Sequence, residues 1–273
     1  MTISSTPSLP RLIACDLDGT LVRHDGTVSE RTVAVFAKLE EAGVPFVFIT
    51  GRPPRLMGPI AEAFGARGHG TAVCSNGAYD YDLRAGAVVA EYTIDPATLA
   101  KAARGLREAV PGIGLAVEYA DGLAADDLYE AWDWDEGVTI ERLTEAELWG
   151  RPAPKLVGRH PTLSADELVA LAEPAIGDLV TVYHSNGLRL VEAVAHGVSK
   201  AEGLARYAGG LGVPAADVIA FGDMPNDLSM LRWAGHSYAV GNAHPSVLAA
   251  AGGVVGSNEE DGVAVFLEGL LGL

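Results

Sequence analysis

Cysteine is scarce in this chain, and its scarcity argues against two kinds of protein. Cys15 and Cys74 are the two cysteines among 273 residues, and neither belongs to a CxxC motif or a Cys/His cluster. A small domain held together by disulfides and a cysteine-ligated zinc site are both disfavoured. Each cysteine ends an apolar run, so we expect two buried, unpaired thiols. The seven histidines likewise show no metal-ligand spacing.

Basic residues and long apolar runs are scarce too. Lys and Arg number 19 against 36 Asp and Glu, which gives a formal net charge of −17. Such a surface repels nucleic acid and anionic membranes, so we expect neither as a partner, and an anionic substrate has to be attracted by a metal ion or a few well-placed cations. No apolar run approaches the ~20 residues that span a bilayer, and the first residues lack a secretory-signal pattern. We expect a cytoplasmic protein, either a monomer or a homodimer.

What the chain does contain is a recurring unit of strand, polar turn and helix. Hydrophobic residues make up 49% of the sequence, enough for a large core. Short apolar runs end in a polar or glycine-rich turn, and a helical pattern usually follows, which indicates an α/β fold with a doubly wound parallel sheet. The runs are LIAC before Asp16, PFVFI before Thr50, TAVC before Ser75, DVIAF before Gly222 and SYAV before Gly241. Helices are predicted over residues 29–42, 53–64, 199–209, 227–234, 245–251 and 262–270.

The pattern changes between Tyr81 and Val191. Alternating apolar and polar residues in AVVAEYTI, GLAVEYA and LVTVYHS are typical of half-exposed antiparallel strands, and helical runs lie near residues 96–109 and 165–175. We interpret this part as an inserted α+β domain. The predicted division is a discontinuous core of residues 1–82 and 191–273, with an inserted cap of residues 83–190.

The first polar turn carries two carboxylates, in Asp16-Leu17-Asp18-Gly19-Thr20. Alternate residues of an extended segment project to the same side, so Asp16 and Asp18 can act together as nucleophile and acid/base, or hold a hard divalent cation. A calcium loop of the EF-hand type is disfavoured, because the third acidic or amide position before its glycine is missing and a strand, not a helix, precedes the turn.

Four further turns are expected beside the first one, because ligands bind at the carboxyl ends of the strands in open parallel sheets. Each has a structural alternative: an ordinary turn, a helix cap or a solvated surface residue. Hydroxyl, guanidinium, amide and ammonium groups in these turns suit phosphate oxygens, and the last turn adds two carboxylates. The turns are Thr50-Gly51-Arg52, Ser75-Asn76-Gly77-Ala78, Ser199-Lys200 at the start of a predicted helix, and Gly222 to Asp227.

Together, and in this order, these turns resemble the four motifs of the haloacid dehalogenase-like phosphatases. SNGA, GVSKAEGL and the late Gly241-Asn242-Ala243 are similar to the Cof-type branch, which has a large α/β cap (type IIB) inserted after the third core strand. The resemblance covers both core segments, whereas the cap matches in size and position alone. It implies a Rossmann-like core and a Mg²⁺ cofactor.

The resemblance also implies a role for each motif residue. Asp16 attacks phosphorus and forms an aspartyl phosphate, while Asp18 protonates the leaving group and then activates water. The Asp16 carboxylate, the Asp18 backbone carbonyl and Asp223 hold Mg²⁺. The remaining roles are phosphate or substrate binding for Thr50, Gly51, Arg52, Asn76, Asn226 and Lys200, of which Lys200 is also catalytic, and support from Thr20 and Asp227.

The sequence therefore predicts a Mg²⁺-dependent phosphomonoesterase that acts on a small phosphorylated metabolite, with a sugar phosphate favoured. Asp18 separates this chain from the dehalogenases and cation pumps of the superfamily, which lack the second aspartate. Two alternatives stay open: a phosphomutase that passes the phosphoryl group to a sugar hydroxyl, and a non-catalytic sensor of a phosphorylated metabolite. A dinucleotide-binding enzyme is disfavoured, because no GxGxxG turn follows the first strand.

Three features of the predicted cap have both a structural and a functional interpretation. The stretch from Asp126 to Glu136 is acidic with interleaved aromatics; packing and solvation are favoured there over sugar binding. Lys155 lies in an apolar run, and we favour a structural role for it over contact with the site. His184 and Asn186 lie close enough to the predicted core boundary to face a substrate.

Overall fold

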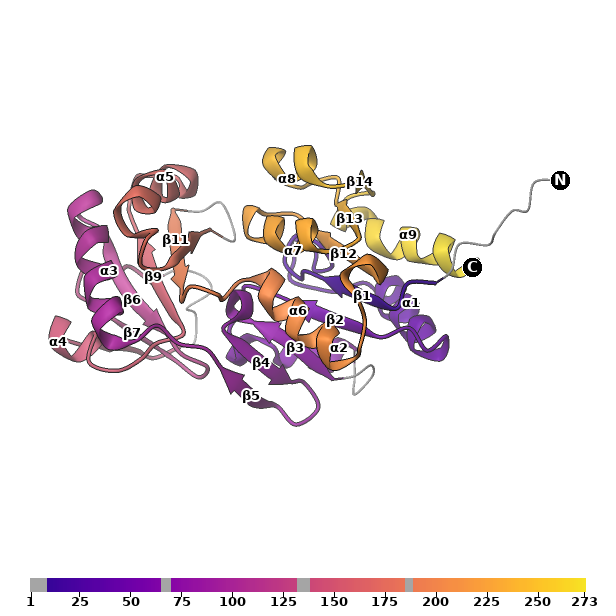
Figure 1. Cartoon of the computed structure of the whole chain (residues 1–273), viewed down its shortest axis with the longest axis horizontal. Coiled ribbons are helices and arrows are strands. Elements are labelled where there is room, and N and C mark those ends of the chain that lie inside the picture. The colour runs from indigo at the N-terminus through magenta and orange to yellow at the C-terminus, as the bar shows by residue number, and fades with distance from the viewer. Residues whose placement is uncertain (1–8, 65–69, 132–137, 185–188) are drawn as a thin grey trace.

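The computed structural model describes residues 9–64, 70–131, 138–184 and 189–273. The described chain forms two β-sheets, each with its own hydrophobic core and its own helices (Figure 1). The larger sheet has eight strands and is built from the first and last parts of the described chain. The smaller sheet has six strands and is built from the middle of the sequence.

The larger sheet has the strand order β14-β13-β12-β1-β2-β3-β4-β5. Its strands from β14 to β3 are parallel, and β4 and β5 extend the sheet as an antiparallel hairpin. Every residue of β1, β2 and β12 is buried, as expected for parallel strands covered by helices on both faces. The strands are β1 (Leu12–Cys15), β2 (Phe46–Ile49), β3 (Thr71–Cys74), β4 (Tyr79–Asp82), β5 (Ala87–Glu91), β12 (Val218–Gly222), β13 (His236–Ala239) and β14 (Gly253–Val254).

Most helices of the larger unit begin and end where the sequence predicts. Ser29 caps α1 by accepting from the backbone N–H of Thr32, and the helix stops before Gly43, whose φ is positive. The single helix predicted over 53–64 is wrong, because the proline pair and Gly58 divide it into a 3₁₀ turn (Pro54–Leu56) and a short α2. The α-helices are α1 (Glu30–Glu41), α2 (Gly58–Phe64), α6 (Lys200–Gly210), α7 (Leu228–Trp233), α8 (Pro245–Ala250) and α9 (Gly262–Leu271).

Aromatic packing fixes α1 and α2 on the larger sheet. The ring of Phe36 on α1 lies 4.8 Å from that of Phe46 and 5.3 Å from that of Phe64, and Phe48 lies 4.7 Å from Phe64. These four side chains are at most 5% exposed. Each buried ring contributes roughly 2–3 kcal/mol of transfer free energy, so this cluster holds β2, and the turn that follows it, in place.

The smaller sheet has the order β10-β11-β9-β6-β7-β8 and is antiparallel except between β7 and β8. Helices α3 and α5 pack on the same face of it, where Leu115, Val117 and Leu156 form the centre of its core. The elements are β6 (Gly114–Glu118), β7 (Leu123–Ala125), β8 (Ile140–Arg142), β9 (Lys155–Arg159), β10 (Thr181–Tyr183), β11 (Leu190–Val194), α3 (Pro96–Ala109), α4 (Glu145–Leu148) and α5 (Ala165–Ile176).

The sheets shift the expected domain boundaries by several residues. β5 (Ala87–Glu91) pairs with β4 in the larger sheet although it lies beyond residue 82, because it forms the second arm of a hairpin. β11 pairs with β9 and β10 in the smaller sheet, although the second core segment was expected to start at 191. We propose a division at the segments that cross between the sheets: a core of residues 9–91 and 195–273, and a cap of residues 92–194.

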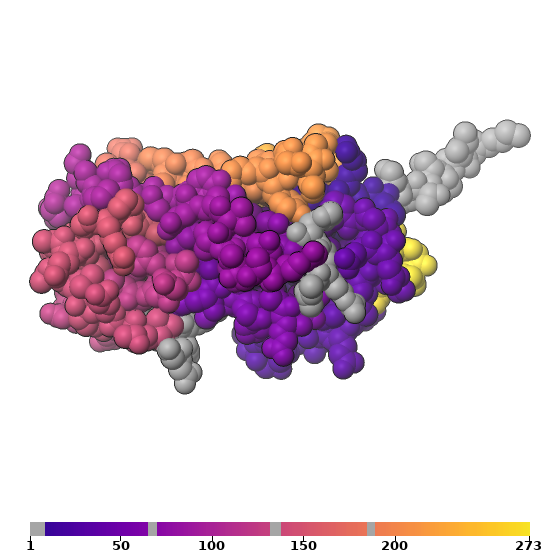
Figure 2. Space-filling view, turned by 90° about the horizontal axis from the view of Figure 1, so that it is seen from below, coloured from indigo at the N-terminus to yellow at the C-terminus, as the bar shows by residue number. Residues whose placement is uncertain are grey.

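The two units lie end to end in an elongated molecule, with the end that carries α3 and α4 farthest from α9 (Figures 1 and 2). Within the described residues, no helix is both long and apolar enough to cross a membrane. Cys15 and Cys74 are buried and unpaired, as the sequence predicts.

Candidate active site

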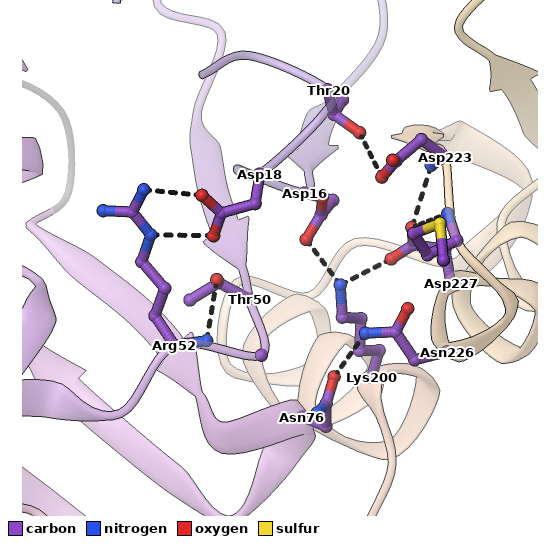
Figure 3. A network of polar contacts seen from close by, with 12 residues as sticks. Asp16, Asp18, Thr20, Thr50, Arg52, Asn76, Lys200, Asp223, Asn226 and Asp227 are labelled. Carbon is purple, nitrogen blue, oxygen red and sulfur yellow. Dashed lines mark hydrogen bonds and ion pairs between the residues drawn. The ribbon is translucent and has the colours of Figure 1, made fainter. Parts of the chain in front are cut away.

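The polar turns of the sequence converge at one edge of the larger sheet (Figure 3). β1, β2, β3 and β12 are parallel neighbours in the sheet, so their carboxyl ends and the turns that follow them lie side by side. The amino end of α6 brings Lys200 to the same place, where Ser199 caps the helix by accepting from the backbone N–H groups of Ala201 and Glu202.

Lys200 joins two carboxylates at the centre of the site. Its Nζ donates to Oδ1 of Asp16 at 2.5 Å and to Oδ1 of Asp227 at 2.5 Å. The three residues are 1%, 4% and 0% exposed, respectively. Burial alone would lower the pKa of Lys200, but Asp16 and Asp227 raise it above its ordinary value. Lys200 is therefore an ammonium, and within the described chain these bonds use two of its three donors.

Three buried carboxylates surround that one ammonium. Asp16, Asp223 and Asp227 each place an oxygen within 4.8 Å of the others. Burial, together with repulsion by Asp227 and Asp18, raises the pKa of Asp16 to about 7 against the opposing effect of Lys200. Burial and the charge of Asp16 likewise raise the pKa of Asp223 well above its ordinary value.

Backbone contacts hold the carboxylates in this arrangement. Oδ2 of Asp227 accepts from the N–H groups of Asp223 (2.9 Å) and Met224 (3.0 Å), and Thr20 donates to Oδ1 of Asp223 at 3.2 Å. A fixed set of buried carboxylate oxygens with uncompensated negative charge is what a hard divalent cation binds, and oxygen ligands of this kind suit Mg²⁺. The residues present fit the expected magnesium ion.

Glycine is required in the first turn for two reasons. Gly19 has φ +79°, in the left-handed region, and a Cβ added there would overlap the Asp223 carboxylate. Asn242 then donates to the Gly19 carbonyl at 2.8 Å, which fixes the peptide. The turn can therefore lie directly against the acidic cluster. The Asp18 backbone carbonyl, which the resemblance gives as a metal ligand, belongs to this turn.

Asp18 points away from the acidic cluster and pairs with Arg52. Nε and Nη2 of Arg52 donate to the two oxygens of Asp18 at 2.7 and 2.6 Å, a bidentate pair (Figure 3). The backbone N–H of Arg52 donates to Oγ1 of Thr50 at 3.1 Å. Thr50 is fully buried, and a hydroxyl that accepts one hydrogen bond still has its own hydrogen to donate.

The turn after β3 has a strained backbone. Ser75 and Asn76 have φ of +47° and +54°, and non-glycine residues in this region mark functional sites in many proteins. The side chain of Asn76 is 1% exposed, and its Oδ1 accepts from Nδ2 of Asn226 at 2.8 Å. The Asn76 side chain also interacts with the hydroxyl of Tyr183 on β10, so a residue of the smaller sheet reaches this turn.

This fold and this set of turns match a known family. A family model of haloacid dehalogenase-like hydrolases matches residues 13–267. The chain belongs to this family. It is 30% identical to 5-amino-6-(5-phospho-D-ribitylamino)uracil phosphatase YitU of Bacillus subtilis (strain 168), over 95% of this chain and 97% of the relative. It is 29% identical to pyridoxal phosphate phosphatase YbhA of Escherichia coli (strain K12), over 94% and 97%.

The fold of the hydrolase is also that of solved members of the superfamily. BT1666 of Bacteroides thetaiotaomicron, a phosphatase of this superfamily, superposes with a TM-score of 0.80 at 22% identity, over 100% of this chain and 98% of that one. The expected α/β fold and the expected family are therefore confirmed. The chain is an enzyme of the hydrolase class whose named relatives are phosphatases.

The predicted site residues of the hydrolase come together, with two differences in how they are oriented. Asp227, expected to support the metal site and to orient Lys200, does bind Lys200, and it also contributes an oxygen to the acidic cluster. Arg52, expected at the phosphate, instead holds Asp18. The residues labelled in Figure 3 are Asp16, Asp18, Thr20, Thr50, Arg52, Asn76, Lys200, Asp223, Asn226 and Asp227, and Gly51 lies between Thr50 and Arg52 in the chain.

Two of the cap features have local structural contacts. Asp126 accepts from the backbone N–H groups of Leu115, Leu128 and Tyr129 and pairs with Arg107, so it shapes a turn. His184 lies 2.9 Å from Asp166 on α5. Residues 132–136 of the acidic stretch, and Asn186, lie outside the described residues.

A charged cluster that sequence reasoning missed lies where the cap meets the second motif. Lys155, for which a structural role away from the site was favoured, is 2% exposed and donates to the carbonyl of Gly51. Glu118 and Glu192 bind Lys155, and Arg55 binds Glu118. The available signal was a carboxylate in each of two apolar strand sequences, GLAVE and LVEAV.

Proposed function

We propose that this hydrolase is a Mg²⁺-dependent phosphomonoesterase that acts on small phosphorylated metabolites through an aspartyl-phosphate intermediate. The observation that carries the proposal is the placement of Asp16. Its carboxylate is buried, bound by Lys200 and set among acidic oxygens, and the second carboxylate of the same turn, Asp18, is held separately by Arg52. This arrangement supports a role for Asp16 as the nucleophile and for Asp18 as the acid/base.

In the first step, an Asp16 oxygen forms a bond to phosphorus while the bond from phosphorus to the ester oxygen breaks. Asp18 gives a proton to that leaving oxygen. In the second step, water attacks the phosphorus of the aspartyl phosphate, Asp18 takes the water proton, and Asp16 leaves as a carboxylate. For these steps Asp18 gives up its pairing with Arg52, because the incoming phosphoryl group, itself an anion, takes the guanidinium. Asp18 then takes up a proton from solvent before the first step, and it regains that proton from water in the second step.

The other site residues bind the transferring group in this proposal. Lys200 offers its third donor and Thr50 its hydroxyl hydrogen to phosphoryl oxygens, and Asn76 contributes its side-chain amide to substrate binding. The Asp16 and Asp223 carboxylates and the Asp18 backbone carbonyl would hold Mg²⁺, and Asp227 supports them through Lys200 and the Asp223 peptide. The ion would supply compensation for the charge of the phosphoryl oxygens.

We favour a sugar phosphate as the substrate. The relatives YitU and YbhA are named for a phosphoribityl compound and for pyridoxal phosphate, both small phosphorylated metabolites. Because a net charge of −17 repels an anionic substrate, the substrate has to be attracted locally, and Lys200, Arg52 and the metal would supply the positive charge.

The test is phosphate release, with Mg²⁺, from a panel that contains an aryl phosphate, hexose and pentose phosphates, nucleotides and pyridoxal phosphate. Asp16→Asn is the control, since an amide cannot form the aspartyl phosphate. We expect release that requires both the metal and Asp16 and that is fastest for a sugar phosphate. Release unchanged in Asp16→Asn, or after exhaustive chelation, contradicts the mechanism.

The same panel separates the two alternatives. A phosphomutase would convert one sugar phosphate into its positional isomer with little release, which ³¹P NMR of the reaction mixture detects. A sensor would bind a panel member without converting it, and binding without turnover would replace the phosphatase proposal.

A further inference from the structure

The charged cluster at the junction of cap and core consists of Arg55, Glu118, Lys155 and Glu192, and we define it as the junction cluster. Lys155 Nζ lies 2.9 Å from Glu118 and 2.7 Å from Glu192, and Arg55 lies 3.0 Å from the other oxygen of Glu118. Lys155 stands directly opposite Glu118 in the β6–β9 ladder, and Glu192 lies diagonally across from it on β11. Two positive and two negative charges balance inside this cluster.

We propose that Lys155 is a positioning residue of the phosphatase reaction: it acts on the phosphoryl site through the Gly51–Arg52 peptide and Thr50. The proposal rests on the function proposed above. Its first basis is that Lys155 Nζ also donates to the carbonyl oxygen of Gly51 at 3.0 Å, which links the cap to the second motif.

Direct binding of substrate by Lys155 does not fit its contacts. An ammonium has three donors, and Lys155 spends them on Glu118, Glu192 and the Gly51 carbonyl. Burial alone would lower the pKa of Lys155, but Glu118 and Glu192 hold it above its ordinary value, so the charge is permanent. Lys155 is thus a fixed charged donor that already has a partner for each hydrogen.

Of the three partners of Lys155, the Gly51 carbonyl is the one that connects it to the site. The carbonyl of Gly51 and the N–H of Arg52 belong to the same planar unit, and that N–H donates to Oγ1 of Thr50 at 3.1 Å. Lys155 therefore fixes the orientation of the peptide from its carbonyl side. It also polarises the peptide, so the N–H becomes a stronger donor to Thr50, and hydrogen bonds in such a chain strengthen one another.

The consequence falls on the hydroxyl hydrogen of Thr50. Its oxygen is occupied as an acceptor, so the hydrogen is directed elsewhere and is a better donor to a phosphoryl oxygen. Lys155 comes from the cap, whereas Thr50 and Gly51 belong to the core, so seating the cap completes the phosphoryl site. The effect is on the phosphoryl group and is independent of the leaving group.

A double-mutant cycle between Lys155→Met and Thr50→Val tests this relay. The cycle is measured in a Glu192→Gln background, so that losing the ammonium does not break the buried ion pair of Lys155 with Glu192, while Glu118 keeps its ion pair with Arg55. Each protein is assayed for kcat/KM with an aryl phosphate and with a sugar phosphate, and for the Ki of inorganic phosphate. Circular dichroism and thermal unfolding establish that all four proteins are folded, and Lys101→Met, on the exposed face of α3, is the matched control.

We expect Lys155→Met to lower kcat/KM about tenfold for both substrates and to raise the phosphate Ki by a similar factor, since one charge-assisted hydrogen bond is lost. In the Thr50→Val background the same change should cost less than about twofold, because the relay is already interrupted. Lys101→Met should have no effect.

If Lys155→Met lowered kcat/KM tenfold both with Thr50 and in the Thr50→Val background, the inference would be overturned. A lysine with only a structural role gives losses that add in this way. A loss confined to the sugar phosphate would overturn it too and would assign Lys155 to the leaving group. Absence of Asp16-dependent phosphate release in the unmodified enzyme would instead refute the proposed function, so the two failures are distinguishable.

Discussion

Replacing Lys200 with methionine tests the electrostatic account of the site most directly. The variant keeps a side chain of similar length but leaves Asp16, Asp223 and Asp227 buried together without an ammonium. Removing one partner of a buried ion pair costs ~3–5 kcal/mol, because the remaining charge has no solvent to replace the lost partner. Without metal, Lys200→Met should lose about that much free energy of unfolding at pH 8.

The loss should depend on pH in a direction that the Asp16 pKa fixes. Asp16 has a pKa of about 7 in the folded protein and an ordinary value of 3.8 in the unfolded chain. Without Lys200, which lowers that pKa, the folded variant keeps the Asp16 proton to higher pH. Between pH 7 and 8 the folded variant then binds a proton that the unfolded chain does not, so its stability falls by up to about 1.4 kcal/mol per pH unit as pH rises. In the wild type most of this fall is complete by pH 7.

The assay is urea unfolding of both proteins in EDTA at pH 6 and pH 8. The difference in stability between wild type and Lys200→Met should be larger at pH 8. Lys101→Met, an exposed lysine on α3, should stay within about 0.5 kcal/mol of wild type at both values. The double variant Asp16→Asn/Lys200→Met should recover most of the loss, since one buried charge is removed. A loss below 1 kcal/mol, or one equal at the two pH values, would refute this reasoning.

Three further changes should separate binding, packing and ionisation. Gly19→Ala should weaken Mg²⁺ binding at least about tenfold by calorimetry, because the added methyl overlaps the Asp223 carboxylate at φ +79°; affinity within twofold of wild type would contradict that crowding. Phe36→Ala should cost ~3–5 kcal/mol in urea unfolding yet leave Mg²⁺ affinity unchanged, because its ring partners Phe46 and Phe64 lie on β2 and α2 and not among the carboxylates. Burial would raise the pKa of Glu118, but Lys155 and Arg55 lower it below its ordinary 4.5. The ionised form therefore stabilises the fold above pH 4.5, so the stability lost in Glu118→Gln should shrink as pH falls below 4.5; a constant loss from pH 7 to pH 3.5 would exclude this ion pairing.

The turns of the candidate active site could be predicted from sequence because each is a local pattern at the end of an apolar strand. Asp16, Asp18, Thr50 and Asp223 each follow their strand within a few residues, and the carboxyl ends of neighbouring parallel strands meet at one edge whatever the details of packing. What the pattern does not fix is the direction in which each side chain turns. Arg52 was expected at the phosphate, yet it is bound to Asp18. This pairing depends on the distance between the turn after β1 and the turn after β2, which the local sequence does not give.

The junction cluster shows why contacts between strands and between the two units could not be predicted from the sequence. Alternation along β6, β9 and β11 puts Glu118, Lys155 and Glu192 on the face opposite α3 and α5, and each strand taken alone predicts that its charged residue faces out. For Lys155 the sequence favoured a structural role over contact with the site. The strand order β11-β9-β6 instead places all three side by side, and Gly51 and Arg55 of the core cover them. The order in which strands pair and the contact between the two units depend on residues that are far apart in the sequence. The proposed catalytic residues can therefore be predicted from local sequence, whereas the proposed link from the cap to the site can be recognised only in the folded structure.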